Sequence, residues 1–317
     1  MAKFLVFRLA GMLAILFVIS ALVFVVTELL PGNVATMILG NEATPAEVAN
    51  LQRLLGLDQP AWVRFADWMG GLVAGDFGQS LRMQRPIGPI LAERLGNSLV
   101  LTGVSLVFVV VGGFVLALVT ALREGSRLDR VLTAVSVVGT SLPEFVSGTL
   151  LVLVFAGGVV SLLPPSGYEG FEQGIGDGLA HLVLPAATLG LVLAAYVGRV
   201  ARASLVEVLH SDYVRAARLK GLPEWRVVLT HALPNVLVPA LTVLSMNLGW
   251  MFGGIVVVEE IFVFPGIGRL MLFAIAERDW PVIQACAVVI ASVYVIGNAI
   301  GDMAALLADP RLREAGR

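Results

Sequence analysis

The chain has 317 residues, of which 58% are hydrophobic and only 14% are charged, and its mean hydropathy is +0.91. Soluble domains carry about 25% charged residues, and each helix that crosses a bilayer needs roughly 20 apolar residues. Several runs reach that length, which excludes a soluble globular protein and indicates a polytopic membrane protein. The net charge of −2 discriminates little, and the single cysteine excludes an internal disulfide and a multi-cysteine metal site.

Six apolar segments predict an all-α fold with six transmembrane helices. In chain order they are 9–30, 99–122, 131–162, 182–200, 236–258 and 282–307. The first exceeds a signal-peptide apolar region and no small-residue cleavage site follows it, so we expect a retained helix. The third is too long for one straight span: either it kinks at Pro143, or part of 131–142 lies at the cytoplasmic surface. We expect Pro185 and Pro239 in first turns, where proline is tolerated.

Lys and Arg residues gather in alternate loops. The loops 123–130 and 201–231 and the C-terminus are basic, whereas 163–181 has no Lys or Arg and carries acidic residues. Cytoplasmic loops of membrane proteins carry the excess of basic residues. Both termini and the loop 201–231 are therefore expected in the cytoplasm, with 31–98, 163–181 and 259–281 on the outer side.

The outer segment 31–98 shows helical signals rather than those of a plain linker. Thr44 and Glu47 form a capping-box pattern before an amphipathic stretch at 45–57, and Gly56 is a plausible stop. Aromatic residues suited to a membrane interface follow, namely Trp62, Phe65, Trp68 and Phe77. Two interpretations remain open and compatible: a cap packed on the helix ends, or a docking surface for a delivered partner.

Motifs for chemistry are missing. The chain has two lysines, Lys3 and Lys220, and neither stands in the Gly-x-x-x-x-Gly-Lys-Ser/Thr pattern that cradles phosphate. The three histidines are isolated, and no serine occupies a Gly-x-Ser-x-Gly turn. We therefore predict no catalytic site, no metal site and no ATP-binding loop in this chain.

A basic, small-residue stretch at 211–221 predicts a short helix. Ser211 or Asp212 can cap its start, Lys220 suits its last turn, and Gly221 can adopt the left-handed conformation that ends it. Helical spacing places four residues on one predicted face, namely Tyr213, Ala216, Ala217 and Lys220. Alanines there would leave a shallow surface for a partner; the alternative is an ordinary basic cytoplasmic loop.

The order Ala216-Ala217, three residues, Gly221, nine residues and His231-Ala232-Leu233-Pro234 resembles the "EAA" loop of permease subunits in bacterial ABC importers. In that family the loop forms a coupling helix that docks on the ATPase. The resemblance assigns this role to Tyr213, Arg215, Ala216, Ala217, Lys220, Gly221, Leu233 and Pro234. The chain departs from the family at two positions, because Arg215 replaces the leading Glu and His231 replaces an Ile.

Further motifs extend the resemblance over nearly the whole chain, to the B-type permease of dipeptide, oligopeptide and nickel importers. They are Leu30-Pro31-Gly32-Asn33, Leu55-Gly56-Leu57-Asp58-Gln59-Pro60, Gly75-Asp76-Phe77-Gly78-Gln79-Ser80-Leu81, Val257-Val258-Glu259-Glu260-Ile261-Phe262, Phe264-Pro265-Gly266-Ile267-Gly268-Arg269 and Ala308-Asp309-Pro310-Arg311. The resemblance implies a type I ABC importer permease (MetI-like) fold. The chain would then divide into four parts: residues 1–30 with the first helix, the outer segment 31–98, a core 99–307 with the coupling loop 201–235, and a cytoplasmic tail 308–317.

The same resemblance implies the partners and the location. A C-type permease subunit, two ATP-binding subunits that hold ATP and Mg, and an extracytoplasmic solute-binding protein would assemble with this chain in the bacterial plasma (inner) membrane. The chain would contact membrane lipid and no nucleic acid, hold no cofactor and import peptides. Nickel or another small solute such as glutathione is the alternative cargo. A secondary transporter or an intramembrane enzyme needs paired ionisable residues, inverted repeats or a catalytic set within the spans, which the sequence lacks.

Residues of the cargo pathway can be named only from polarity and from the family. Ser245, Asn247 and Trp250 form the most polar group of the fifth helix, which lines the path in the family. Glu144 is either a functional carboxylate at membrane depth or a solvated one near the interface. Candidates for an outer gate or partner docking are Asp76, Phe77, Phe264, Pro265 and Gly266. Rows of small residues every four positions, at Gly190–Gly198 and Gly249–Gly253, predict close helix packing or a widened path.

Overall fold

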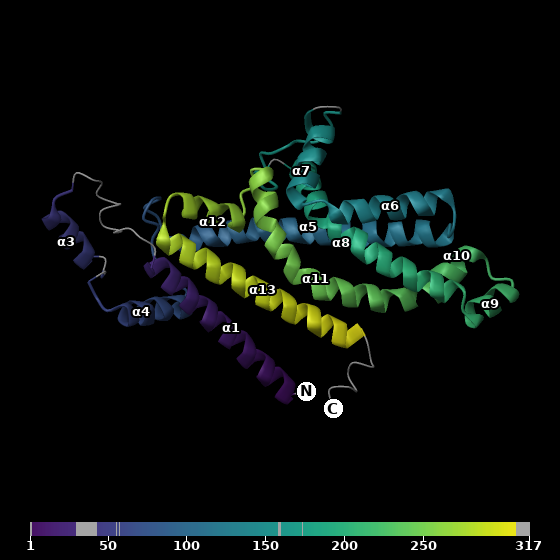
Figure 1. Cartoon of the computed structure of the whole chain (residues 1–317), viewed down its shortest axis with the longest axis horizontal. Coiled ribbons are helices and arrows are strands. Elements are labelled where there is room, and N and C mark those ends of the chain that lie inside the picture. Colours follow the sequence, from purple (N-terminus) through teal and green to yellow (C-terminus); the bar gives the residue numbers. More distant parts are fainter. Residues whose placement is uncertain are drawn as a thin grey trace. The chain divides into compact units, whose positions relative to one another are not determined.

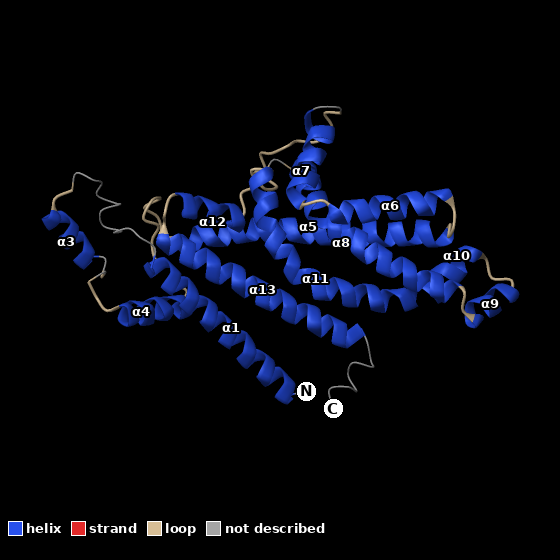
Figure 2. Ribbon diagram, in the orientation of Figure 1, coloured by secondary structure: helices blue, strands red, loops and turns tan. Residues whose placement is uncertain are grey.

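A computed structural model describes residues 2–29, 43–54, 56, 58–157, 160–172 and 174–308. All regular elements in these ranges are helices, and only an isolated bridge joins Gln79 to Pro86 (Figure 2). The α-helices are α1 (Ala2–Leu29), α3 (Pro45–Leu54), α4 (Ala61–Ala74), α5 (Ile87–Leu122), α6 (Arg127–Ser141), α7 (Glu144–Val152), α8 (Ile175–Leu209), α9 (Asp212–Leu219), α10 (Glu224–Arg226), α11 (Leu233–Ile261), α12 (Ile267–Ala276) and α13 (Trp280–Ala308). The π-helical turns η1 (Leu153–Gly157) and η2 (Val227–Ala232) follow α7 and α10.

The number of membrane spans agrees with the prediction. Five of the described helices are long and apolar enough to cross a bilayer, and the number rises to six if α6 and α7–η1, which are bent by 114° at their break, form one span. The bend falls at Leu142 and Pro143, which are extended between the two helices. The expected break at Pro143 is therefore present, and the overlong third segment forms two helices instead of one straight span.

Two proline predictions are wrong. Pro185 lies inside α8 and Pro239 lies inside α11, each well beyond the first turn. Hydropathy marks only the apolar part of a helix, whereas α8 begins at Ile175 with turns that carry Asp177 and His181. For the same reason α5 begins at Ile87, inside the segment 31–98 that was expected to precede it. The tail 309–317 and the Leu30–Asn33 motif lie outside the described residues.

The chain divides into two compact units. Unit 1 comprises residues 1–95 and 270–293, and unit 2 comprises 96–269 and 294–317. Helices α5, α12 and α13, which are labelled in Figure 1, each contribute residues to both units. The predicted outer segment thus shares its unit with α1 and with the start of α13.

Aromatic packing joins the outer segment to the first span within unit 1. Phe24 of α1 contacts Phe65 and Trp68 of α4, with ring centroids 5.3 Å and 6.0 Å away. The predicted capping box is present at the start of α3, where the Glu47 carboxylate accepts from the backbone N–H of Thr44 at 2.8 Å. That bond lowers the pKa of Glu47. Gly56 has a φ of +66°, as its role as a stop requires.

A buried aspartate fixes the turn before α5 in unit 1. Asp279 is fully buried, and its carboxylate accepts from the Ser80 hydroxyl and from the backbone N–H groups of Leu81 (3.2 Å) and Arg82 (3.1 Å). Charged acceptors make strong bonds to backbone N–H groups. The outer segment is therefore fastened to the residue that precedes α13.

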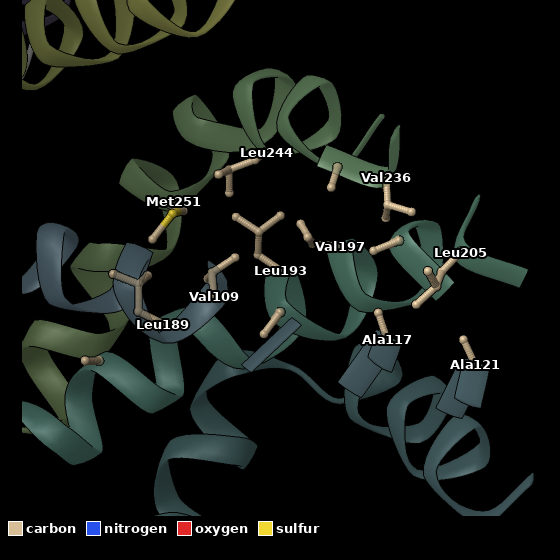
Figure 3. Packing of buried hydrophobic residues seen from close by; sticks show 14 of the residues in the cluster. Val109, Ala117, Ala121, Leu189, Leu193, Val197, Leu205, Val236, Leu244 and Met251 are labelled. Carbon is tan, nitrogen blue, oxygen red and sulfur yellow. The ribbon is translucent and has the colours of Figure 1, made fainter. Parts of the chain in front are cut away.

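The core of unit 2 is built on α8. Leu189, Leu193 and Val197 of this helix pack toward Val109 of α5 and Met251 of α11 (Figure 3). The small-residue row of α8 explains the close approach. A Cβ on Gly190 would lie 3.1 Å from the Ser105 carbonyl oxygen, and one on Gly198 would lie 3.0 Å from that of Gly113. These glycines serve packing rather than a widened path.

Candidate functional site

The inner face of α9 packs on the rest of unit 2. Val214 and Ala217 lie three positions apart and are buried, in the same hydrophobic cluster as Val227 and Val228 of η2. Side chains three or four positions apart share one face of a helix. Apolar burial therefore holds α9 in a fixed orientation at the end of α8.

The outer face of α9 differs from the predicted one. The exposed positions of this segment are Asp212, Tyr213, Arg215, Ala216, Arg218, Leu219 and Lys220. Ala217 was expected on this face, but it is only 5% exposed and contacts the chain's own core. Leu219 was not predicted, and it is 83% exposed. The surface open to a partner thus carries an alanine and a leucine among charged side chains of both signs.

Both ends of α9 follow the predicted chemistry in their backbone. Ser211 occupies the N-cap position with an extended backbone, although its hydroxyl donates to the Val208 carbonyl instead of accepting from α9. Gly221 has a φ of +78°, the left-handed conformation, and its N–H donates to the Arg218 carbonyl at 2.9 Å. A β-branched residue is strongly disfavoured at such a φ.

Arg218 ties α9 to the elements before and after it. Its guanidinium donates to both carboxylate oxygens of Glu224, at 3.1 Å and 2.6 Å, and to the Leu209 carbonyl at 3.3 Å. The hydrogen bonds to Glu224 raise the pKa of Arg218. A bidentate pair adds geometric specificity to the attraction. This arginine therefore positions α9.

Tyr213 links α9 to the start of α11. Its hydroxyl accepts from the Asn235 amide at 3.1 Å and donates to the His231 carbonyl at 3.4 Å. Leu233 is half-buried and Pro234 is exposed in the first turn of α11, where a proline costs no helical hydrogen bond. The predicted coupling residues thus form one region of unit 2, from α9 to the first turn of α11.

A pocket of about 360 Å³ in unit 2 contains two of the predicted pathway residues. It is lined by Thr140, Leu142, Pro143, Glu144, Phe145, Val192, Trp250, Gly253, Gly254 and Val257. Glu144 and Trp250 are therefore brought to one site, at the break between α6 and α7. Oxygen Oε1 of Glu144 is buried and has no hydrogen-bond partner within the described residues, whereas the residue as a whole is half-buried.

The other two pathway candidates lie elsewhere. Ser245 is 6% exposed, and its carbonyl oxygen lies 2.5 Å from where a Cβ on Gly301 of α13 would stand. The Asn247 amide donates to the Val243 carbonyl of its own helix at 2.8 Å. Neither residue lines the pocket.

The predicted outer turn is fixed by a buried carboxylate that was not singled out. Glu259 of α11 is fully buried and accepts from the Ser98 hydroxyl and from the Arg269 N–H at 3.0 Å. The Ile267 N–H donates to the Ser98 oxygen at 2.9 Å, which completes the network. A Cβ on Gly266 would lie 1.9 Å from the Glu259 carboxylate, so this position needs a glycine for close approach. In the sequence, Glu259 can be found as a glutamate at the end of an apolar run.

The remaining gate candidates are distributed over both units. Phe264 is buried and stacks on Tyr168 with centroids 4.7 Å apart, and the Pro265 carbonyl accepts from the Asn97 amide at 2.9 Å. Burial raises the pKa of the Tyr168 phenol. Asp76 belongs to unit 1 and is exposed, and its carboxylate accepts from the Gly78 N–H at 2.9 Å. Phe77 is half-buried in the same turn.

Comparison with known families decides what kind of protein carries these sites. Residues 113–314 match the family described as "Binding-protein-dependent transport system inner membrane component", and residues 1–104 match its N-terminal family. The chain belongs to this family of transport permeases. Its described helices are those of a multi-pass membrane protein.

Individual relatives of this permease align over their full length. It is 37% identical over 313 residues to the "Probable peptide ABC transporter permease protein y4tP" of Sinorhizobium fredii, covering 99% of this chain and 100% of that protein. It is 36% identical over 315 residues to the "Glutathione transport system permease protein GsiC" of Escherichia coli K12, covering 99% of both. A solved structure entitled "Crystal structure of an amino acid ABC transporter with histidines" covers 70% of this chain at 20% identity, with a TM-score of 0.45.

The described part of this permease contains no group of three or more His, Cys, Asp or Glu side chains that could hold a metal ion. The carboxylates described above are instead committed to backbone N–H groups, to hydroxyls or to arginines, with Glu144 as the exception. Asp129, for example, is 4% exposed and forms a bidentate pair with Arg202 at 2.9 Å and 2.8 Å. That pair fastens α6 alongside α8 (Figure 1).

Proposed function

We propose that this permease is the B-type membrane subunit of an ATP-driven importer for dipeptides and oligopeptides. The observation that carries the proposal is the α9 region, in which an apolar inner face anchors the helix and an outer face presents Ala216 and Leu219 among the charged side chains of Asp212, Arg215 and Lys220. Such a surface suits a groove on a separate ATP-binding subunit. Membership of the permease family supports this use of the region.

The proposed mechanism is alternating access. Two ATP-binding subunits that hold ATP and Mg close on each other and move α9, which is rigidly joined to α8 and α11 through Val214, Arg218 and Tyr213. Motion of α9 then moves the helices that pack in the core of unit 2. The bundle must have two states that differ in their contact with the nucleotide-bound ATPase, because only a differential interaction can shift a conformational equilibrium.

The proposed assembly also includes a C-type permease and an extracytoplasmic solute-binding protein. In the bacterial plasma membrane both termini and the loop 201–235 would face the cytoplasm, and the segment 31–98 would face the binding protein. Asp76, Phe77 and the 264–266 turn are proposed to act on the outer side. The cargo is proposed to pass Glu144 and Trp250, which line one pocket.

Peptide is the preferred cargo because one relative, similar over its whole length, is named a probable peptide permease. Glutathione is the second candidate, because another relative of nearly equal similarity carries that cargo in its name. Transport assays with a dipeptide and with glutathione separate the two proposals.

The first test is the composition of the complex. The chain is tagged, extracted from its native membrane in mild detergent, and its stoichiometric partners are identified by mass spectrometry. We expect a second permease and two ATP-binding chains, with ATP hydrolysis that is stimulated by peptide-loaded binding protein. Reproducible recovery of this chain alone in several mild detergents contradicts the proposal.

A substitution on α9 tests the coupling surface. We expect Leu219→Asp to leave the chain folded, because the side chain is 83% exposed, and to abolish co-purification of the ATP-binding subunits. The matched control is Leu162→Asp, the same change at a leucine that is 70% exposed in the loop before α8. If the Leu219 variant retains the ATP-binding subunits in full, the assignment of α9 as the docking surface is wrong.

A further inference from the structure

The pocket at the α6–α7 break combines a carboxylate with aromatic and glycine residues. Helix α7 contributes Glu144 and Phe145, and α11 contributes Trp250, Gly253 and Gly254. Its volume of about 360 Å³ falls within the range of roughly 300–1,000 Å³ that is usual for small-molecule sites. The pocket is therefore large enough for part of a small cargo molecule.

Glu144 is half-buried, and its carboxylate lacks the partners that the buried carboxylates of unit 2 have. Its Oε1 atom is buried without a hydrogen bond, and none of the ion pairs between described residues involves Glu144. A carboxylate removed from water without a partner is costly. This arrangement favours occupation by a hydrogen-bond donor with positive charge.

The neighbouring Gly254 leaves room for the Glu144 carboxylate. A Cβ on Gly254 would lie 2.4 Å from Oε1 and 2.5 Å from Oε2, so the carboxylate occupies the space that a larger residue would fill. Gly253, one position earlier, has open space beside it and lines the same pocket. The bare surface of α11 thus gives the carboxylate its position and the pocket its depth.

Local explanations leave Oε1 unsatisfied. Glu144 is in the first turn of α7, where the helix dipole favours an anion, but that attraction supplies no hydrogen bond to Oε1. Arg199 bonds to a residue that lines the pocket, because its guanidinium donates to the Thr140 hydroxyl at 3.4 Å. This bond leaves Oε1 of Glu144 without a partner. Neither feature accounts for the unpaired oxygen.

The aromatic residues suit a cation. Phe145 and Trp250 are 56% and 45% exposed, so ring surface is open at the pocket. Ammonium groups are attracted to the faces of aromatic rings, most strongly to Trp. A carboxylate beside exposed rings therefore selects an organic cation over an anion or an uncharged solute.

We propose that this pocket binds the protonated amino group of the cargo, with Glu144 as the hydrogen-bond acceptor and Trp250 as an aromatic contact. The inference rests on the proposed importer function and names the chemical group of the cargo that this site recognises. It makes Glu144 a specificity-determining residue for cations within the permease.

The test uses the complete complex in nanodiscs without its binding protein, so that binding to the permease is measured alone. Alanine methyl ester serves as the cationic probe and N-acetylalanine as the anionic one, and equilibrium binding of the radiolabelled probes, which does not depend on Trp250, is measured. We expect saturable binding of the ester only. Glu144→Gln should weaken it by about tenfold, the scale of one charge-assisted hydrogen bond. The control Glu172→Gln, an exposed carboxylate in the loop before α8, should leave it unchanged.

A second variant keeps the test decisive if Glu144→Gln fails to assemble. Trp250→Leu retains the carboxylate and removes the ring, and it should weaken binding of the ester several-fold. Equal affinity in both variants and the wild type, or equal binding of the two probes, overturns the proposal. If a basic residue of the second permease already fills the pocket, the ester does not bind, and this result also overturns the proposal.

Failure of the cargo assignment is distinguishable from failure of this inference. Uptake of dialanine by the complete transporter with its binding protein tests the proposed function. Uptake of dialanine with no Glu144-dependent binding of the ester refutes only the pocket. Binding of the ester with no uptake of any peptide refutes only the peptide cargo.

Discussion

Glu259 and Glu144 are both carboxylates of unit 2 that lie against a glycine, yet their surroundings differ. Glu259 accepts from the Ser98 hydroxyl and from the Arg269 N–H, and it is fully buried. Glu144 presents a buried oxygen with no partner to an open pocket. The first carboxylate completes a network, whereas the second leaves one incomplete.

The difference separates a structural role from a binding role. A satisfied buried network is rigid and specifies one arrangement, so Glu259 fixes the turn before α12. An unsatisfied buried group reduces stability and persists where it serves another purpose. Stability and cargo recognition are therefore expected to respond in opposite ways to changes at the two residues.

The largest expected effect is the loss of Glu259. Glu259→Ala leaves the Ser98 hydroxyl and the Arg269 N–H without their acceptor, which should cost about 2–4 kcal/mol of stability. The measurement is the apparent melting temperature of the purified complex in detergent, where a drop of several degrees is expected.

The adjacent glutamate provides the control. Glu260 is exposed and lies 3.8 Å from the Arg269 guanidinium, an exposed ion pair of the kind that contributes about 0–1 kcal/mol. Glu260→Ala should leave the melting temperature nearly unchanged. Similar drops in both variants would show that charge on α11, rather than the buried network, sets the stability.

The two glycines give an intermediate effect and sharpen the contrast. An added methyl group at Gly266 meets a carboxylate held by two partners, whereas one at Gly254 meets a carboxylate that can swing into the pocket. We expect Gly266→Ala to lower stability by about 1–3 kcal/mol, as overpacking does. Gly254→Ala should leave stability unchanged or higher, because alanine favours the helix by up to about 1 kcal/mol.

The readouts for the glycine pair are the melting temperature and binding of alanine methyl ester in nanodiscs. The Gly254 variant should lose much of the ester binding while remaining as stable as the wild type, and the Gly266 variant should show the reverse. A loss of stability at Gly254 equal to that at Gly266 would mean that Glu144 is as firmly held as Glu259.

Local chemistry explains what the sequence predicts correctly. Apolar runs predict the spans, Pro143 predicts the bend, and the left-handed conformations of Gly56 and Gly221 follow from their places after helices. Each of these features depends on residues within a few positions of one another. The capping box of Thr44 and Glu47 belongs to the same class.

Tertiary contacts explain what the sequence leaves open. Both faces of α9 are compatible with helical spacing, and only the packing of Val214 and Ala217 against η2 decides that Leu219 is exposed. The bond between Ser98 and Glu259 joins residues 161 positions apart, which no local pattern indicates. The sequence likewise names Glu144 and Trp250 but does not show that they share a pocket, because that depends on how the bend places α7 beside α11.

The smallest expected effect on stability is that of Glu144 itself. Glu144→Leu removes a desolvated carboxylate that makes no hydrogen bond through Oε1, and it fills similar space with apolar atoms. Replacing buried charges by apolar residues of similar volume is often neutral or stabilising. Loss of the favourable helix-dipole interaction at the start of α7 opposes this gain by about 0.3–1 kcal/mol. The net change should lie within about 1 kcal/mol of zero.

The melting temperature of the Glu144→Leu complex should therefore match that of the wild type, while binding of the ester disappears. A fall comparable to that of Glu259→Ala would give Glu144 a structural role and remove the contrast between the two carboxylates. Unchanged stability with lost binding would show instead that the permease tolerates an unpaired carboxylate at this site because its partner arrives with the cargo.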